Sequence, residues 1–260
     1  DELTQRLRDA YRGDGHFNWW VAAGGRHFTF FHSGTKCEKI QDVAPNPQHV
    51  CRACWRLNQG AGCCHQCAYC GLGGVLINHV NVEDYIEHLA QLIKRNPWQT
   101  TYLLDDAMDV PTLEPQMDML GPLMRFFETT GDRCLIIHTK TDRVAGFLNA
   151  NAPQNTIIAW SLSGPTQSSR LEKVAGTTDG RLAAARVCAE AGITVRFKFK
   201  PIIPVPNWRE DAAYMIARMF EETQPDNLSM TVLMWMDVDT LKACLGEDLL
   251  DADCLAAAEA

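Results

Sequence analysis

The chain has 260 residues, of which 46% are hydrophobic and 22% charged, so it is long enough for one large domain or two small ones with a substantial core. No apolar run approaches the ~18 residues that a membrane span needs, and no signal peptide is recognisable, so we expect no membrane contact. The formal net charge of −8 argues against tight, non-specific binding of nucleic acid, although it leaves room for a local basic groove.

The chain contains eleven cysteines, a high count for this length. The number is odd and no secretory signal accompanies it, so reduced thiols that serve metals or chemistry are favoured over a disulfide framework. The cysteine content therefore predicts a cytoplasmic protein in a reducing setting.

Residues 1–50 are irregular, aromatic-rich and turn-prone, and we expect them to form an N-terminal extension packed on a core of residues 51–260. From about residue 54, short β-rich runs alternate with amphipathic segments of helical length. The expected strands are residues 54–58, 100–105, 134–140, 156–163, 194–203 and 228–235. The expected helices are residues 82–95, 115–129, 142–151, 179–191 (with Asp179 as N-cap), 208–222 and 238–250.

Strands that are each followed by a helix imply βαβ units and a parallel sheet. Six such units predict the α/β class and a partial, open, six-stranded β/α barrel. In such folds the functional site lies at the carboxyl ends of the strands.

A cluster of cysteines follows the first expected strand, in the stretch GAGCCHQCAYCGLGG. Its members are Cys63, Cys64, Cys67 and Cys70. In one pattern, Cys51 and Cys54 combine with Cys67 and Cys70 as two CxxC pairs, which is typical of a zinc ribbon. In the other, Cys63, Cys67 and Cys70 place three thiolates on one loop, where they can ligate three irons of a 4Fe–4S cluster and leave the fourth iron open.

The surroundings of the loop favour the iron–sulfur pattern. A zinc ribbon is an autonomous knuckle that needs no β/α units downstream, whereas this loop directly follows the first expected strand and precedes several glycines. Cys64 does not fit the trio and is expected to be a spare thiol. Cys37, Cys51 and Cys54 remain candidates for a second metal site, or else small buried hydrophobic residues.

With Tyr69 before its last cysteine, the loop resembles the CxxxCxYC signature of the radical S-adenosylmethionine (radical SAM) superfamily. The resemblance implies that Tyr69 contacts the cofactor. The resemblance implies that the amino and carboxylate groups of S-adenosylmethionine chelate the open iron. It also implies that an electron donor such as a flavodoxin or ferredoxin reduces the cluster, which then cleaves a C–S bond to give a 5′-deoxyadenosyl radical.

Three downstream segments together resemble the spore photoproduct lyase family and its relatives. They read LIIHTKTDRVAGFLNAN, IIAWSLS and RLEKVAGTTDGRLAAARVCAEAGITVRFKFKPII. The resemblance covers about residues 54–235 and implies that Lys140 and Ser161 lie near S-adenosylmethionine. It also places Asp105 and Asp106 on a cofactor-contacting segment, with helix capping as the alternative role for these two carboxylates.

Three cations alternate with two phenylalanines along the fifth expected strand and so share one face: Arg196, Lys198 and Lys200. We expect that face to line the cavity, where Lys198 would meet an anionic substrate or the carboxylate of the cofactor. His138, on the face of Lys140, is expected to be a satisfied interior histidine or a proton-transfer group. Arg181 can reach the cofactor end of the barrel, and Met230 is expected in the core.

Two departures separate the chain from the spore photoproduct lyases. Gly71 stands where those enzymes carry a tyrosine, and the segment LLDDAMDV lacks their hydrogen-donating cysteine. We therefore expect a radical SAM enzyme of lyase or transferase type that acts on a small-molecule or peptide-like substrate. Repair of a nucleic-acid lesion and a non-enzymatic zinc-binding module are the alternatives.

Overall fold

The computed structural model describes residues 18–22, 30–33, 54–72, 75–104, 107–149, 154–233 and 236–259. Four residues discussed above lie outside these ranges: Cys37, Cys51, Asp105 and Asp106. The predicted contacts of Asp105 and Asp106 with a cofactor therefore stay predictions.

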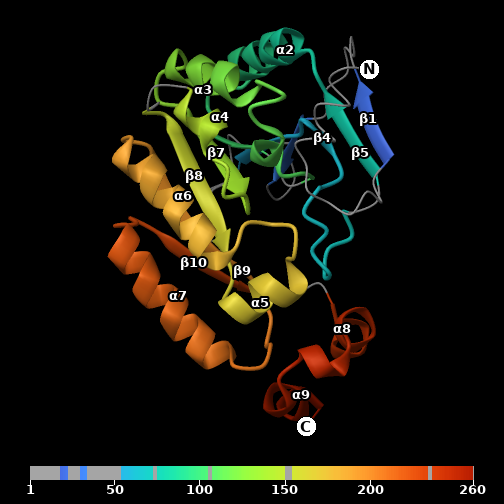
Figure 1. Ribbon diagram of the computed structural model, residues 1–260. Coiled ribbons are helices and arrows are strands. Elements are labelled where there is room, and N and C mark those ends of the chain that lie inside the picture. The colour runs from blue at the N-terminus through green and yellow to red at the C-terminus, as the bar shows by residue number, and fades with distance from the viewer. Residues whose placement is uncertain are drawn as a thin grey trace.

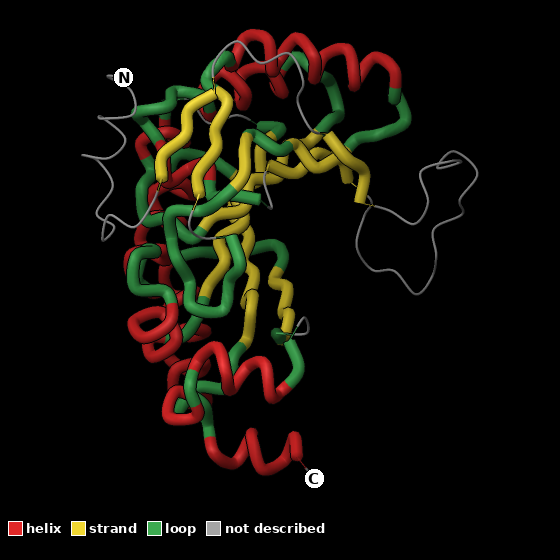
Figure 2. The backbone as a smooth tube through the Cα atoms, turned by 90° about the vertical axis from the view of Figure 1, so that its right-hand side faces the viewer, coloured by secondary structure: helices red, strands yellow, loops and turns green. Residues whose placement is uncertain are grey.

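A sheet of seven strands forms the centre of the molecule, in the order β10-β9-β8-β7-β6-β3-β2. Its strands are β2 (Phe30–Ser33), β3 (Cys54–Leu57), β6 (Thr101–Leu104), β7 (Cys134–Thr139), β8 (Thr156–Leu162), β9 (Thr194–Ile202) and β10 (Leu228–Val232). In this sheet β3, β6, β7, β8, β9 and β10 are parallel, and β2 pairs with β3 in the antiparallel sense. The six parallel strands curl into a half-barrel (Figure 2), which confirms the predicted fold class.

Helices gather on one side of the curved sheet and leave its inner face clear of helices (Figure 2). The helices of the described residues are α2 (Val82–Arg95), η2 (Val110–Leu113), α3 (Leu120–Glu128), α4 (Ala145–Leu148), α5 (Pro165–Leu171), α6 (Thr178–Glu190), α7 (Trp208–Glu222), α8 (Val238–Leu245), η3 (Glu247–Leu249) and α9 (Ala252–Glu259). Figure 1 shows α6 and α7 side by side along β8, β9 and β10, while α8 and α9 form the C-terminal end. No helix in the described ranges combines the length and the apolar character that a membrane crossing requires.

The alternation along β9 decides which side chains meet the helices. Val195, Phe197 and Phe199 are buried in the main core, between the sheet and the helices. The residues that alternate with them, including Lys198 and Lys200, are half-buried on the opposite face. The expected arrangement, with apolar residues toward the helices and cations toward the inner face, agrees with this burial pattern.

Local details differ from the sequence-based expectations at several places. The helix that contains Asp179 begins at Thr178, and its N-cap is Thr177, whose side chain accepts a hydrogen bond from the amide of Gly180. Helix α5 was not expected. Met230, expected in the core, is 70% exposed and lies on β10, the edge strand of the sheet.

A second, small sheet lies beside the half-barrel. It joins β1 (Asn18–Ala22), β5 (Val75–His79) and β4 (Gly60–Ala61), with β5 in the middle. Strand β1 is parallel to β5, and β4 is antiparallel to it. This sheet matters for the site because β4 and β5 are the two ends of the cysteine loop.

Candidate functional site

The cysteine loop, residues 62–72, is closed at its base by the ladder between β4 and β5. Gly60 pairs with Asn78 across this ladder, and the amide of Cys63 donates to the carbonyl of Leu72 at 2.8 Å. A Cβ atom on Gly60 would lie 2.0 Å from the backbone oxygen of Ile77, so only glycine allows the two strands to approach this closely.

From this base the loop extends toward α5 (Figure 1), where the amide of Ala68 donates to the carbonyl of Leu171 at 2.8 Å. The C-terminal helices cover the same region. Cys67 and Tyr69 belong to a second apolar cluster with Leu245 of α8 and Leu250 beyond η3. The far end of the loop is thus held against the carboxyl ends of the strands, where the βα rule places the site.

The three predicted metal ligands differ in exposure along the loop. Cys63 is half-buried, Cys67 is buried and Cys70 is exposed, and all three are free thiols. Burial, with a further contribution from the negative charge of Asp109, raises the pKa of Cys63 well above its ordinary value. Burial, and then the charge of Glu172, raises the pKa of Cys67 to about 11. These buried thiols stay protonated at neutral pH unless a cation replaces the proton.

The chemistry of the donor set suits an iron–sulfur cluster. Three thiols lie within eight residues, Cys63 accepts a hydrogen bond from the backbone amide of His65, and Cys67 is hydrogen-bonded to Tyr69. In the described ranges, no group of three or more His, Cys, Asp or Glu side chains is arranged to hold a single metal ion. Cys64 points away into the main core, as expected of the spare thiol.

Two buried carboxylates fasten the loop to the barrel, and the first is Asp109. His65 of the loop donates from Nε2 to Asp109 Oδ2 at 2.9 Å, and the backbone amide of Lys140 donates to the same oxygen at 2.6 Å. The hydroxyls of Thr112 and Thr139 donate to Oδ1 at 3.1 and 2.8 Å. Burial alone would raise the pKa of Asp109, but the charge and hydrogen bond of His65 and the other donors outweigh burial and lower this pKa.

The second carboxylate, Glu172, follows α5 and accepts from the loop through Tyr69. The hydroxyl of Tyr69 donates to Glu172 Oε1 at 2.5 Å, and Lys140 Nζ donates to the same oxygen at 2.9 Å. The Nε2 group of Gln167 is 3.2 Å away and also donates to Oε1. Burial and the charge of Glu172 together raise the pKa of the Tyr69 phenol, so this hydroxyl remains a donor.

The other oxygen of Glu172 is held by Arg181, the first arginine of α6. Arg181 Nη2 donates to Glu172 Oε2 at 2.6 Å, and Ser163 Oγ donates to the same atom at 2.6 Å. The remaining guanidinium donors reach the carbonyls of Gly176 and Ser161. Although burial opposes ionisation, the charges of Lys140 and Arg181 and the hydrogen bonds of Ser163 and Tyr69 hold the pKa of Glu172 well below its usual range.

The charges around Glu172 do not cancel. Among the described residues, Lys140 and Arg181 make ion pairs with this one carboxylate and with no other. Arg181 is fully buried and the side chain of Lys140 is only 15% exposed, so one positive charge remains in a poorly solvated place. Lys140 Nζ also donates to the carbonyl of Lys200 at 3.3 Å, and no described residue accepts its third N–H.

The predicted cofactor residues Lys140, Ser161 and Lys198 occupy one row across three strands. Ser161 is the register partner of Lys198, and Lys140 lies one residue beyond the pair Thr139–Trp160. Lys198 Nζ lies 2.5 Å from Nε2 of His138, so His138 is an interior partner of this lysine. The structure therefore gathers these predicted residues, while Tyr69 reaches the same place from the cysteine loop.

Sequence reasoning missed Asp109, Glu172 and Ser163. The signal that could have pointed to Glu172 is its position between the end of a strand and the Arg181 helix, in the segment LEKVAGTTDGRL. Asp109 was adjacent to the two carboxylates that the sequence favoured, Asp105 and Asp106. Nothing in the local pattern distinguishes one of these aspartates from the next.

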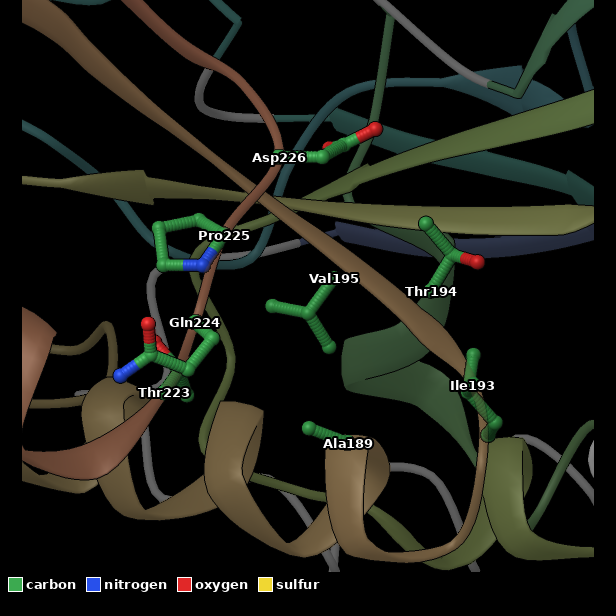
Figure 3. Close-up of a pocket in the computed structure, with 8 residues that line it drawn as sticks. All are labelled: Ala189, Ile193, Thr194, Val195, Thr223, Gln224, Pro225 and Asp226. Atoms are coloured by element: carbon green, nitrogen blue, oxygen red, sulfur yellow. The ribbon is translucent and has the colours of Figure 1, made fainter.

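A separate pocket of about 360 Å³ lies at the opposite end of the barrel, beside the start of β9 (Figure 3). Its lining comes from the ends of α6 and α7 and includes Thr194, Thr223 and Asp226. Asp226 forms an ion pair with Arg196 at 2.7 Å. None of the predicted site residues lines this pocket.

A half-barrel of six parallel strands, with a three-cysteine loop and a basic row at the carboxyl ends, defines the radical SAM class of fold. The family model described as spore photoproduct lyase matches residues 50–236, and the chain belongs to this family. No curated protein matches the chain by sequence.

Solved structures of related shape agree with the fold. A spore photoproduct lyase double mutant with bound AdoMet and dinucleoside spore photoproduct has a TM-score of 0.68 and 19% identity over 97% of this chain and 72% of its own. A spore photoproduct lyase complexed with dinucleoside spore photoproduct has a TM-score of 0.60 and 22% identity over 68% of this chain, which spans 55% of that lyase. SuiB from Streptococcus suis has a TM-score of 0.51 and 16% identity over 69% of this chain and 39% of its own.

Proposed function

We propose that this protein is a radical SAM enzyme in which Cys63, Cys67 and Cys70 ligate a 4Fe–4S cluster. The observation that carries the proposal is the single surplus positive charge at Lys140 and Arg181, directly beside the cysteine loop. A buried surplus of this kind is stabilised by an anionic group, and S-adenosylmethionine bears a carboxylate. Lys140 has one N–H left for that carboxylate, and Ser161 and Lys198 extend the row of polar contacts.

When bound, the cluster and S-adenosylmethionine together would supply a 5′-deoxyadenosyl radical. The chain itself holds the loop with Asp109 and Glu172, orients Lys140, and covers Cys67 with apolar residues of the C-terminal helices that exclude water. A small ferredoxin or flavodoxin is the proposed electron donor. An organic substrate, either a small molecule or a peptide, is proposed for the inner face of the half-barrel.

Anaerobic purification and reconstitution test the proposal. The protein should be brown with about four irons per chain, and reduction with S-adenosylmethionine present should release 5′-deoxyadenosine. Cys67→Ala should abolish both the colour and the product. The matched control is Cys64→Ala, a neighbouring thiol buried in the main core, which should keep both. A colourless protein that contains zinc would contradict the proposal, and loss of colour in Cys64→Ala would overturn the choice of ligands.

Repair of a nucleic-acid lesion is the second candidate function. It is favoured by membership of the spore photoproduct lyase family and by the similar lyase structures solved with dinucleoside spore photoproduct. It predicts binding of oligonucleotides that weakens steeply as salt rises, because each phosphate contact releases counterions. Absence of binding at low salt would remove this candidate and leave the organic substrate.

A further inference from the structure

We infer that Arg181 is a positioning residue that tunes the affinity of the site for an anionic ligand through Glu172, without touching that ligand. The inference rests on the proposed function, since the ligand in question is S-adenosylmethionine. It concerns the charge balance of three side chains: Lys140, Glu172 and Arg181.

The geometry makes Glu172 a shared partner of two cations. Its Oε1 atom receives Lys140 at 2.9 Å and its Oε2 atom receives Arg181 at 2.6 Å, so the two cations are bound to opposite oxygens of one carboxylate. If Arg181 were absent, Glu172 would neutralise Lys140 completely. With Arg181 present, the one negative charge of Glu172 is shared between two cations, and Lys140 keeps an effective positive charge for an incoming carboxylate.

Arg181 is placed to act through Glu172 and not by direct contact with a ligand. Its side chain is fully buried and its donors are used by Gly176, Ser161, Ser163 and Glu172. Lys140, in contrast, retains some exposure and an N–H that no described residue accepts. One cation therefore faces the ligand while the other is placed behind the carboxylate.

The same carboxylate also connects the loop to this balance. Tyr69 donates to the Glu172 oxygen that Lys140 uses, and the ammonium of Lys140 lies 5.8 Å from the centre of the Tyr69 ring. The position of Lys140 relative to the cysteine loop is consequently fixed by Glu172, and Arg181 fixes Glu172. This places the anion-binding lysine and the cluster ligands in one rigid arrangement.

Charge substitutions at Arg181 and Glu172 test the inference. Arg181→Met leaves Lys140 and Glu172 as a neutral pair, so the Kd for S-adenosylmethionine on the reconstituted protein should rise about tenfold. The double variant Arg181→Met with Glu172→Gln restores one positive charge on Lys140 and should recover affinity to within about threefold of the parent protein. Arg181→Lys keeps the charge but not the planar fork, and should also bind within about threefold of the parent.

The readouts separate this role from a structural one. Equilibrium binding of S-adenosylmethionine and of S-adenosylhomocysteine, iron content, and thermal unfolding without metal are measured for every variant. Arg186→Met is the matched control, since Arg186 lies on the same helix, pairs with Glu190 and is 43% exposed. It should leave binding unchanged. In turnover, Arg181→Met should raise KM for S-adenosylmethionine more than it lowers kcat.

A double variant that binds no better than Arg181→Met, although both carry the full iron content, overturns the inference. Should Arg181→Met not fold, weak binding by both Arg181→Lys and the double variant overturns it equally. Failure of the proposed function would look different, because the parent protein itself would then hold no cluster and bind no S-adenosylmethionine.

Discussion

The two carboxylates that fasten the cysteine loop are surrounded in opposite ways. Asp109 is surrounded by one imidazole, two hydroxyls and one backbone amide, and its four hydrogen bonds use both oxygens. Glu172 is surrounded by two full cations as well as hydroxyl and amide donors, and the group around it keeps a net positive charge. Asp109 thus forms a closed, structural centre, whereas Glu172 forms a centre that is complete only with an anion.

The two carboxylates thus serve two different requirements of the cysteine loop. The loop has to be rigid enough to present three thiols together, and its surroundings have to attract a charged ligand. Asp109 contributes to the rigidity of the loop through its hydrogen bond with His65. Glu172 orients Lys140, which attracts the charged ligand. Substitutions on the two sides should therefore have different effects on stability and on ligand binding.

Glu172→Gln should have the largest effect on stability. The substitution keeps the shape of the side chain but leaves the buried Arg181 without a counter-charge, which typically costs about 3–5 kcal/mol. Urea unfolding of the metal-free protein measures the free energy of unfolding. Glu190→Gln on the exposed side of α6 is the control and should change it by less than about 0.5 kcal/mol. A loss as small as that of the control would show that the Glu172 centre contributes little to the fold.

Asp109→Asn should cost less, about 2 kcal/mol, because it weakens hydrogen bonds from the Thr139 hydroxyl and the Lys140 amide and does not leave a fully buried guanidinium without its counter-charge. The same variant should retain most of its affinity for S-adenosylmethionine once folded, since no surplus charge depends on Asp109. Unfolding in urea and equilibrium binding are measured together. If the loss of binding free energy exceeded the loss of unfolding free energy, Asp109 would also contribute to ligand binding, and the proposed difference between the two carboxylates would be wrong.

The pH dependence of stability should report both centres. The pKa values of Glu172 and Asp109 are lowered by folding, so their contributions are fully present above the ordinary values of 4.5 and 3.8 and are lost as the pH falls below them. Thermal unfolding of the metal-free protein between about pH 3 and pH 7 should show the midpoint falling on the acid side. Glu172→Gln should flatten this fall more than Asp109→Asn, and an unchanged slope in both variants would contradict the ionised state of the two carboxylates.

The smallest effect concerns the outer end of the loop. Cys70 is exposed while Cys67 is buried with a raised pKa, so iodoacetamide should modify Cys70 well before Cys67 in the metal-free protein. Cys244 of α8 is also exposed and serves as the reference thiol. After cluster loading, peptide mapping should find Cys70 protected and Cys244 still modified. Equal protection of both thiols would indicate a general change in access rather than ligation.

Much of the fold was predictable because its signal is local and repeated. The helices at Val82–Arg95 and Trp208–Glu222 were expected with these same boundaries, since their amphipathic spacing and end residues are unambiguous. The short elements were not predictable. Strand β4 has two residues and exists only because Gly60 can approach β5 closely. The start of α3 depends on Glu114, whose carboxylate accepts from the amides of Met119 and Leu120.

The parallel half-barrel and the three clustered thiols could be predicted from local patterns, because alternating strand and helix periods and a three-cysteine spacing are visible without any distant contact. Which acidic residues matter became clear from the folded chain. Asp109 and Glu172 become the centres of the site because the chain brings the cysteine loop, the end of β7 and the start of α6 together across 30 to more than 100 residues of sequence. Such contacts are fixed by packing and by the need to pair buried charges, and neither of these leaves a local pattern.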